Sequence, residues 1–424
     1  MLARSYHCPG DAHPISRSVH LARLAADYCK CTACPHKNDL GGIGLPPRLP
    51  RVEAPLLPAL ERERIFRSLR NPGAQREVLD HCETLAALFW RETPWELPLN
   101  DWDAAEARVP TGPAVCIAWS ENETARSFAS EVIRIISRSG CRVTTLGSLS
   151  RPALDFAVDH LDCIAGVWVE GGGSPAGIGF RVVGSASMSW SADGRLDDVV
   201  KANLSGTRRP SRSAGSVRSF DILPAYRESL ARHFAASPIT EVAAAGMAES
   251  VQNAWAGLQE RVGCQLRIAA AATRSEETPS ALVLRNLQEE VVRNRLGGGI
   301  VFGPDGRQAW VIDRREGLLS DLIVAERIVA ELRRETGDRE VRVVATEDLM
   351  WTGLNVSGAR LLACAPGEQQ LVEAMQRHRA SLGCDGAGRY WIARPTPRCD
   401  ALLTLAYVSR ALDEMNSALS KAAA

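Results

Sequence analysis

The chain has 424 residues, and its 50 basic and 50 acidic side chains give a formal net charge of zero. This balance offers no electrostatic reason to expect nucleic acid or an anionic membrane as a partner. No apolar stretch approaches the ~20 residues that span a bilayer, and the N-terminus lacks the apolar segment of a signal peptide. We therefore expect a soluble, cytoplasmic protein of about three domains.

The N-terminal segment, residues 1–45, is rich in Cys and His. Cys31 and Cys34 form a Cys-x-x-Cys pair, whose two thiolates can bind one tetrahedral ion, and Zn²⁺ then needs two more sulfur or imidazole ligands. We expect a small zinc module here, with Cys8 and His20 as the other two ligands. The alternatives are Cys29 or His36 as ligands, an iron–sulfur cluster on Cys8, Cys29, Cys31 and Cys34, or free cysteines without a metal.

A proline-rich stretch, residues 46–60, predicts a semi-rigid surface linker. Beyond it, short apolar runs alternate with amphipathic segments. Strand, helix, strand, helix and strand in succession predict a parallel sheet, whose ligands lie at the carboxyl ends of the strands. The expected strands are 115–118, 142–146 and 164–169; the helices carry Phe128 to Ile136 and Pro152 to Leu161. Five cysteines in or beside strands are expected to be free and structural: Cys116, Cys141, Cys163, Cys264 and Cys364.

The third of these strands runs into a glycine-rich loop, Glu170 to Pro175. The loop lies at the carboxyl end of its strand, so a ligand of phosphate or sugar size is the first expectation. The backbone N–H groups of Gly171, Gly172, Gly173 and Ser174 can form an anion-binding nest without any side chain.

The stretch Pro113 to Ser185 resembles the first domain of the α-D-phosphohexomutases, the phosphoglucomutase and phosphomannomutase enzymes. The resemblance rests on Ala165 to Val167, on Ser174 to Ala176 and on Gly179 to Gly184. In that family the loop reads Thr-Ala-Ser-His-Asn-Pro, and its serine carries the exchanged phosphoryl group. The resemblance places Gly172 at the serine position and Gly173 at the histidine position. Glycine cannot hold a phosphoryl group, which leaves Ser174 as a possible substitute nucleophile.

A second region, with a strand at 264–269, a helix at 282–296 and a strand before Gly303, resembles the second domain of this family. There, the resemblance implies, three aspartates hold Mg²⁺ and an arginine follows. The corresponding positions are Gly303, Asp305, Arg307 and Gln308. One carboxylate with a cation beside it is a poor Mg²⁺ site, so Mg²⁺ is not expected. Arg307 is either a fixed substitute for the ion or a plain solvent-exposed arginine.

The third region, with helices at 319–332 and 368–378 and strands at 341–345 and 360–363, resembles the third domain. The family's sugar-specificity loop, Gly-Glu-x-Ser-Gly-His, corresponds here to Cys384 through Arg389. Asp385 can accept hydrogen bonds from a sugar, Ala387 cannot, and Arg389 replaces the histidine. Turn chemistry explains the glycines of this loop without any ligand.

The expected architecture is α/β: three successive phosphohexomutase-like domains, with mixed sheets flanked by helices, after the Cys/His-rich module. The expected boundaries are 61–210, 211–315 and 316–424, and the fourth domain of the family, which binds the substrate phosphate, has no counterpart. The family's phosphoserine and Mg²⁺-binding aspartates are not matched in this chain. The resemblance therefore implies a catalytically degenerate homologue that serves as a scaffold, a regulatory partner or a phosphosugar-binding protein. A protein partner or a homo-oligomer fits this role. The alternative is an active intramolecular phosphotransferase of carbohydrate metabolism that uses Ser174 or a partner chain.

Overall fold

The computed structural model describes residues 5–6, 13–16, 19–20, 64–70, 73–93, 112–172, 177–190, 195–205, 213–234, 240–269, 279–314, 317–337, 340–347 and 358–410. The chain divides into two units, Met1–Leu57 and Pro58–Ala424. In the first unit, β1 (Ser5–Tyr6) pairs antiparallel with β2 (Ile15–Ser16). Of the expected zinc ligands, His20 is described and buried; Cys8, Cys31 and Cys34 lie outside the described residues.

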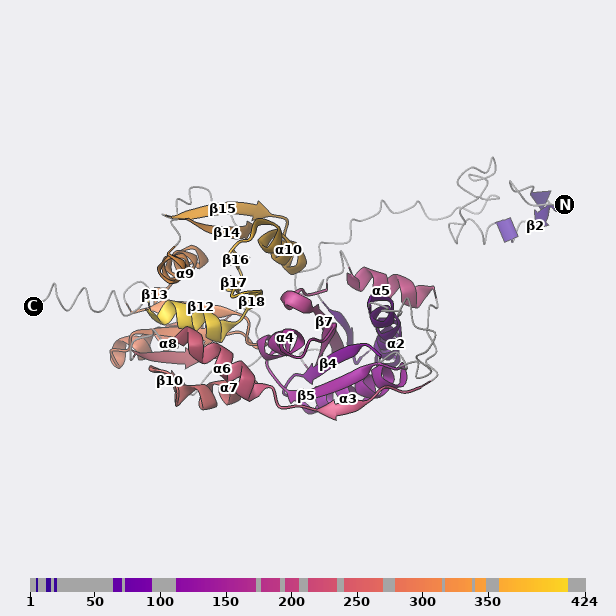
Figure 1. Cartoon of the computed structure of the whole chain (residues 1–424), viewed down its shortest axis with the longest axis horizontal. Helices are drawn as coiled ribbons and strands as arrows, with labels where there is room; N and C mark the ends of the chain where they lie inside the picture. Colours follow the sequence, from indigo (N-terminus) through magenta and orange to yellow (C-terminus); the bar gives the residue numbers. More distant parts are fainter. Residues whose placement is uncertain are drawn as a thin grey trace, which may run out of the picture. The chain divides into compact units, whose positions relative to one another are not determined.

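In the second unit, the first sheet has the order β3-β7-β6-β4-β5-β8. Figure 1 labels its strands β4, β5 and β7. Alternate residues of β4 face opposite sides, as the period of a strand requires. Val115 and Ile117 pack with helices α2, α3 and α5, whereas Cys116 and Ala118 pack with α4. The strands are β3 (Ile65–Ser68), β4 (Ala114–Trp119), β5 (Arg142–Ser148), β6 (Ala165–Gly172), β7 (Gly177–Gly184) and β8 (Val217–Ser219); the helices are α2 (Ala74–Glu92), α3 (Glu123–Arg138), α4 (Arg151–His160) and α5 (Arg195–Leu204).

The second sheet has the order β10-β9-β11-β12-β13 and is parallel at β10, β9 and β11. Small and branched residues of β9 and β11 fill its interior, and α8 covers one face through Leu287 and Val291. Its elements are α6 (Leu223–Phe234), β9 (Thr240–Ala245), α7 (Glu249–Gln259), β10 (Cys264–Ile268), α8 (Ala281–Arg293), β11 (Gly298–Phe302), β12 (Ala309–Asp313) and β13 (Gly317–Leu318).

The third sheet has the order β15-β14-β16-β17-β18. Its helix α9 begins at the cap Ser320, whose hydroxyl accepts from the Ile323 N–H, and ends at Gly337 with φ 70°, a left-handed conformation suited to glycine. Residues 401–410 are helical and buried. The elements are α9 (Asp321–Thr336), β14 (Val341–Thr346), β15 (Ala359–Cys364), α10 (Glu368–His378), β16 (Leu382–Cys384), β17 (Tyr390–Ala393) and β18 (Pro397–Cys399).

The mixed α/β architecture with three sheets is confirmed, and the first sheet is not purely parallel because β7 pairs antiparallel with β6. Two short strands lie past the expected domain boundaries: β8 joins the first sheet beyond residue 210, and β13 joins the second sheet beyond residue 315. The five cysteines expected in or beside strands are buried, and none of them forms a disulfide with a described residue.

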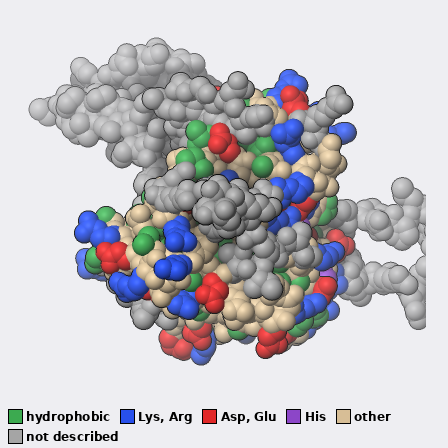
Figure 2. All heavy atoms as spheres, turned by 90° about the vertical axis from the view of Figure 1, so that its left-hand side faces the viewer, with side chains coloured by type: hydrophobic (Ala, Val, Ile, Leu, Met, Phe, Trp, Pro, Cys, Tyr) green, Lys and Arg blue, Asp and Glu red, His purple; other side chains and the backbone are tan. Residues whose placement is uncertain are grey.

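The described helices include none that combines the length and apolarity needed to cross a membrane. On the face drawn in Figure 2, basic and acidic side chains are interspersed, in keeping with the net charge of zero.

Candidate functional site

The glycine-rich end of β6 lies against the start of α3. The Asn122 side chain donates to the Gly171 carbonyl at 2.6 Å and accepts from the Ala125 N–H at 2.7 Å, so one residue caps the helix and fixes the loop. A Cβ on Gly171 would lie 2.8 Å from the Ala125 nitrogen, which leaves no room for a side chain. Gly172 has space around it but adopts φ 85°, which favours glycine. Gly173 and Ser174 lie outside the described residues.

The loop between β11 and β12 holds a fully buried arginine. The Arg307 side chain is 0% exposed, and its guanidinium forms an ion pair with the Glu368 carboxylate at 2.5 Å. It lies over the Trp391 ring, with 5.6 Å to the ring centroid. The interpretation of Arg307 as a plain solvent-exposed arginine is therefore wrong.

Glu368 is also the centre of a wider polar cluster that joins all three sheets. The Ser189 hydroxyl donates to Glu368 at 2.7 Å and accepts from the Arg151 guanidinium at the start of α4. Arg151 itself lies 3.7 Å from the same carboxylate oxygen, and both side chains are 1% exposed. Glu368 is the first residue of α10, where the helix dipole favours a negative charge.

Asp155, one turn along α4 from Arg151, is completely buried beside this cluster. Burial raises its pKa to about 7, although the Arg151 and Arg307 charges oppose the shift. One of its carboxyl oxygens has no hydrogen-bond partner among the described residues. Near neutral pH this acid is therefore far more protonated than an exposed aspartic acid would be.

The residues of the 303–308 loop do not fit Mg²⁺. Asp305 is the one carboxylate at the three positions that resemble the family's metal ligands, and its Oδ1 accepts from the Arg307 N–H at 3.0 Å within the loop itself. The Asp305 carbonyl accepts from the Arg151 N–H at 3.0 Å. Mg²⁺ needs several oxygen ligands, and here a buried guanidinium stands where a carboxylate is required. Across the described residues, no cluster of three His, Cys, Asp or Glu side chains could hold a metal ion.

The side chains and backbone of the 385–389 loop form hydrogen bonds within the loop and with the 303–308 loop. Arg389 donates through Nε to the Asp385 carboxylate at 2.6 Å, and the Ala387 N–H donates to Asp385 Oδ1 at 3.1 Å. Gln308 donates to the Ala387 carbonyl at 3.2 Å, and the Ala309 N–H donates to the Gly388 carbonyl. The Asp385 carboxylate, expected to accept hydrogen bonds from a sugar, thus already accepts one from Arg389 of the same loop.

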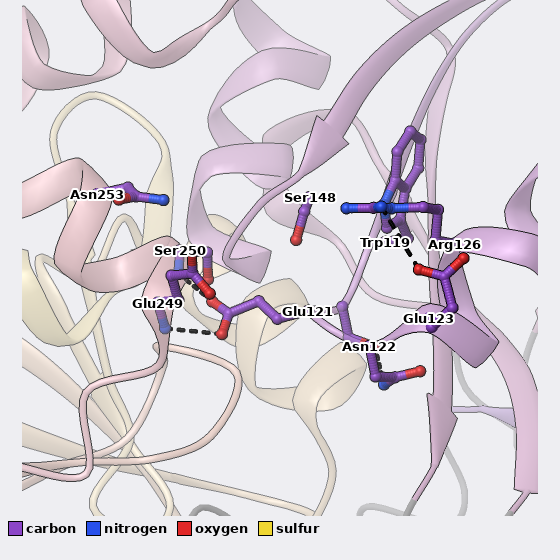
Figure 3. A pocket seen from close by; sticks show the side chains of 10 residues that line it. Trp119, Glu121, Asn122, Glu123, Arg126, Ser148, Glu249, Ser250 and Asn253 are labelled. Carbon is purple, nitrogen blue, oxygen red and sulfur yellow. Dashed lines mark hydrogen bonds and ion pairs between the residues drawn. The ribbon is translucent and has the colours of Figure 1, made fainter.

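A polar cavity of about 190 Å³ lies at the carboxyl ends of β4 and β5, beside the cap of α3. Figure 3 shows Glu121 reaching from the β4–α3 loop to the start of α7, where its carboxylate accepts from the N–H groups of Glu249 and Ser250. No side chain at the start of α7 caps the helix, so Glu121, from a loop next to the first sheet, acts as the cap. The cavity is lined by Trp119, Ser120, Glu121, Asn122, Glu123, Arg126, Ser148, Glu249, Ser250 and Asn253.

The structure brings two of the three expected loops together, those around Asp305 and Asp385. No hydrogen bond or ion pair among the described residues joins Gly171 or Gly172 to either of them. Arg151, Ser189 and Glu368 were not predicted from the sequence. The one usable signal for them is the arginine at a family aspartate position, which needs a carboxylate partner if it is buried.

Comparisons with known proteins agree with this architecture. Residues 103–192 match the family profile described as phosphoglucomutase/phosphomannomutase, alpha/beta/alpha domain I. A phosphoglucosamine mutase of Parafrankia sp. (strain EAN1pec) is 23% identical over 360 residues, covering 78% of this chain and 76% of that protein.

Solved structures share the fold. A phosphoglucomutase/phosphomannomutase family protein from Burkholderia thailandensis matches with a TM-score of 0.66 and 13% identity, over 82% of this chain and 75% of the other. A putative phosphomannomutase from Thermus thermophilus matches with a TM-score of 0.64 and 15% identity, over 83% and 81%. The domain I profile, the curated relative and the shared fold together place this chain in the α-D-phosphohexomutase superfamily.

Proposed function

We propose that the chain is a catalytically degenerate phosphohexomutase homologue that acts as a scaffold, regulatory or phosphosugar-binding protein instead of a mutase. The position that the resemblance assigns to the phosphoserine is Gly172, and its φ of 85° is one that a serine adopts only with strain. A ping-pong transfer needs a side-chain atom to carry the phosphoryl group, and glycine has none.

The observation that carries the proposal is the buried ion pair between Arg307 and Glu368. Arg307 occupies the third of the family's metal-ligand positions, and its guanidinium carries a permanent positive charge. A guanidinium has no lone pair with which to coordinate a divalent cation, so this position cannot serve as a Mg²⁺ ligand. The loop is thus suited to holding three sheets together without Mg²⁺.

The scaffold or regulatory role is favoured over phosphosugar binding by the charges at the 190 Å³ cavity. Glu121 is engaged with the start of α7, and Glu123 pairs with Arg126 at 3.4 Å. Arg126 is the one basic residue in the described lining, against the three carboxylates of Glu121, Glu123 and Glu249. Such a lining suits hydroxyl groups better than a phosphate.

The test is an assay of the full chain for mutase activity. Glucose 1-phosphate, mannose 1-phosphate and glucosamine 1-phosphate are each incubated with Mg²⁺ and a sugar bisphosphate, and ³¹P NMR follows their conversion to 6-phosphates. The glucosamine substrate is included because the curated relative is a phosphoglucosamine mutase. We expect no conversion with any of them; turnover by the pure protein would contradict the proposal.

Mass spectrometry of the same incubations addresses the alternative, an active phosphotransferase. A phosphoserine at Ser174, with turnover lost in Ser174→Ala, would establish that alternative. An unmodified loop together with inactivity would support degeneracy. Calorimetry with glucose 1-phosphate and with glucose then separates phosphosugar binding from a pure scaffold.

A further inference from the structure

A second and larger cavity, of about 830 Å³, lies where α4, the end of α6, the end of α10 and the β17–β18 hairpin meet. It is at the opposite end of β17 from the 385–389 loop, because that loop precedes the strand and the hairpin turn follows it. At the usual rise of a strand, the four residues of β17 separate the two by roughly 13 Å. The cavity therefore does not belong to the site described above.

The charged side chains that line this cavity in the described part of the chain are basic. They are Arg232 on α6, Arg379 at the end of α10, and Arg394 and Arg398 on the hairpin, and no described carboxylate lines the cavity with them. This local excess of positive charge contrasts with the net charge of zero of the whole chain. Such an excess attracts an anion.

Nearby carboxylates neutralise only part of this charge. Glu335 pairs with Arg394 at 3.4 Å, but it is shared with Arg410, which approaches it at 2.6 Å. Asp159 accepts from the Thr396 hydroxyl at the hairpin turn, and buried Asp400 accepts from the Tyr226 hydroxyl. Arg232, Arg379 and Arg398 form no ion pair with any described residue, although the Arg398 charge also acts on the buried Asp400. Most of the positive charge of the lining therefore remains available.

Two of the arginines are held in place and still have free donors. The Arg398 guanidinium lies 4.9 Å from the centroid of the Phe156 ring and donates to the Ser229 hydroxyl at 3.4 Å. Arg398 Nε and Arg394 Nη2 are nevertheless buried N–H groups without a hydrogen-bond partner among the described residues. These two atoms are inaccessible to solvent, so the donors that a bound oxyanion can reach are those of the exposed Arg232 and Arg379.

The neighbouring histidine responds to the same positive potential. The pKa of His233 is lowered to about 4, first by burial and then by the charges of Arg410, Arg232 and Arg394, against the opposing effect of Glu335. His233 is thus neutral at pH 7 and adds one more hydrogen-bonding group to the lining without adding to its charge.

We propose that this cavity binds a small molecule that carries two or more phosphate groups, of the nucleoside-diphosphate class. Guanidinium groups match phosphate oxygens in pairs, and the three arginines without an ion pair correspond to the charge of a diphosphate. The volume falls within the range of small-molecule sites, and the exposed Pro395 offers apolar surface to the rest of the ligand.

The test is isothermal titration calorimetry of the full chain with ADP, pyrophosphate and inorganic phosphate. We expect ADP and pyrophosphate to bind, and inorganic phosphate to bind more weakly because it meets fewer arginines. The double variant Arg232→Gln/Arg379→Gln removes two exposed arginines that have no ion pair with a described residue, and each loss should weaken binding by about tenfold. The matched control is Arg285→Gln, an exposed arginine on α8, which should leave the affinity unchanged.

Thermal melting of each variant verifies that the fold is retained. The proposal is overturned if neither ADP nor pyrophosphate binds, or if inorganic phosphate binds as tightly as pyrophosphate. It is also overturned if the double variant, folded like the parent, binds with unchanged affinity. Binding of a long polyanion such as heparin without binding of ADP would show a macromolecular surface instead.

Discussion

The carboxylate of Glu368, the first residue of α10, lies 2.5 Å from the guanidinium of Arg307 in the loop between β11 and β12, and both side chains are buried. Removing one partner of a buried ion pair leaves the other charge unpaired, which costs about 3–5 kcal/mol. We therefore expect Glu368→Gln, which removes the carboxylate from both Arg307 and Arg151, to lower the free energy of unfolding by that order. Arg307→Met should cost less, because Arg151 and Ser189 still contact Glu368. Urea titration with tryptophan fluorescence measures both.

The double variant Arg307→Met/Glu368→Leu should recover only part of the loss seen in Glu368→Gln, because it removes the unpaired charge of Arg307 but still leaves the buried Arg151 without its carboxylate. As a control, Arg126→Gln removes one member of an exposed pair with Glu123 and should change stability by less than about 1 kcal/mol. Equal and small effects of Arg307→Met and Arg126→Gln would contradict the structural role of the buried pair.

A second prediction concerns the pH dependence caused by Asp155. Its pKa is about 7 in the folded protein, because of burial, and near 4 when unfolded, so the folded state binds more protons between these values. The contribution of this group to stability is complete below about pH 4 and is lost as the pH rises toward 7. Its slope is at most about 1.4 kcal/mol per pH unit.

Asp155→Asn resembles the protonated acid in shape and cannot ionise. We expect urea midpoints measured from about pH 4.5 to about pH 7.5, the window of this titration, to fall less steeply with pH in this variant than in the parent. Asp198→Asn, which alters an exposed carboxylate on α5, is the control and should keep the slope of the parent. Parallel curves for parent and Asp155→Asn would refute the raised pKa.

Alanine substitutions at Gly171 and Gly172, the two described glycines of the loop, should differ in how much stability they cost. A Cβ at position 171 would lie 2.8 Å from a backbone nitrogen, whereas at position 172 the nearest atom is 3.6 Å away and only the positive φ is unfavourable. Gly172→Ala should therefore cost about 1 kcal/mol, and Gly171→Ala distinctly more. Chemical denaturation measures both, and the reverse order would show that the loop packs differently.

The contact of Glu121 with the start of α7 predicts a capping effect across two sheets. Glu121→Ala removes the acceptor for two backbone N–H groups and should lower the free energy of unfolding by about 1 kcal/mol. Glu121→Gln keeps one acceptor oxygen but loses the charge, so it should lie between the parent and the alanine variant. A fully stable Glu121→Ala would show that solvent satisfies these groups equally well.

Zinc binding by the N-terminal segment remains a prediction from the sequence. Plasma mass spectrometry of the purified full chain should find about one zinc per molecule, lost in Cys31→Ser and Cys34→Ser. Cys8→Ser and His20→Ala, compared with Cys29→Ser and His36→Ala, identify the remaining ligands. A chain purified without any metal would contradict the zinc module, and iron in place of zinc would indicate a cluster.

The regular elements were largely predictable because their signals are local. The apolar run around Val115 indicated β4, the helical spacing indicated α3, and the expected helix at 368–378 coincides with α10. The pairing of β8 with β5 was not predictable, since the exposed segment Val217–Ser219 has no hydrophobic alternation to mark it as a strand.

The candidate site was predictable only in its positions. The sequence identified Gly172, Asp305 and Asp385 through a family resemblance. It could not show that Arg389 forms an ion pair with Asp385 or that Glu368 pairs with Arg307. Those partners depend on how loops from different sheets meet. Side-chain periodicity carries no information about such contacts.

A guanidinium at the junction of the three sheets differs from a metal ion in being covalently tethered to the chain. It cannot be stripped by a chelator, exchanged for another ion or lost when the surrounding Mg²⁺ concentration falls. The junction formed by Arg307 therefore keeps its positive charge under any supply of metal.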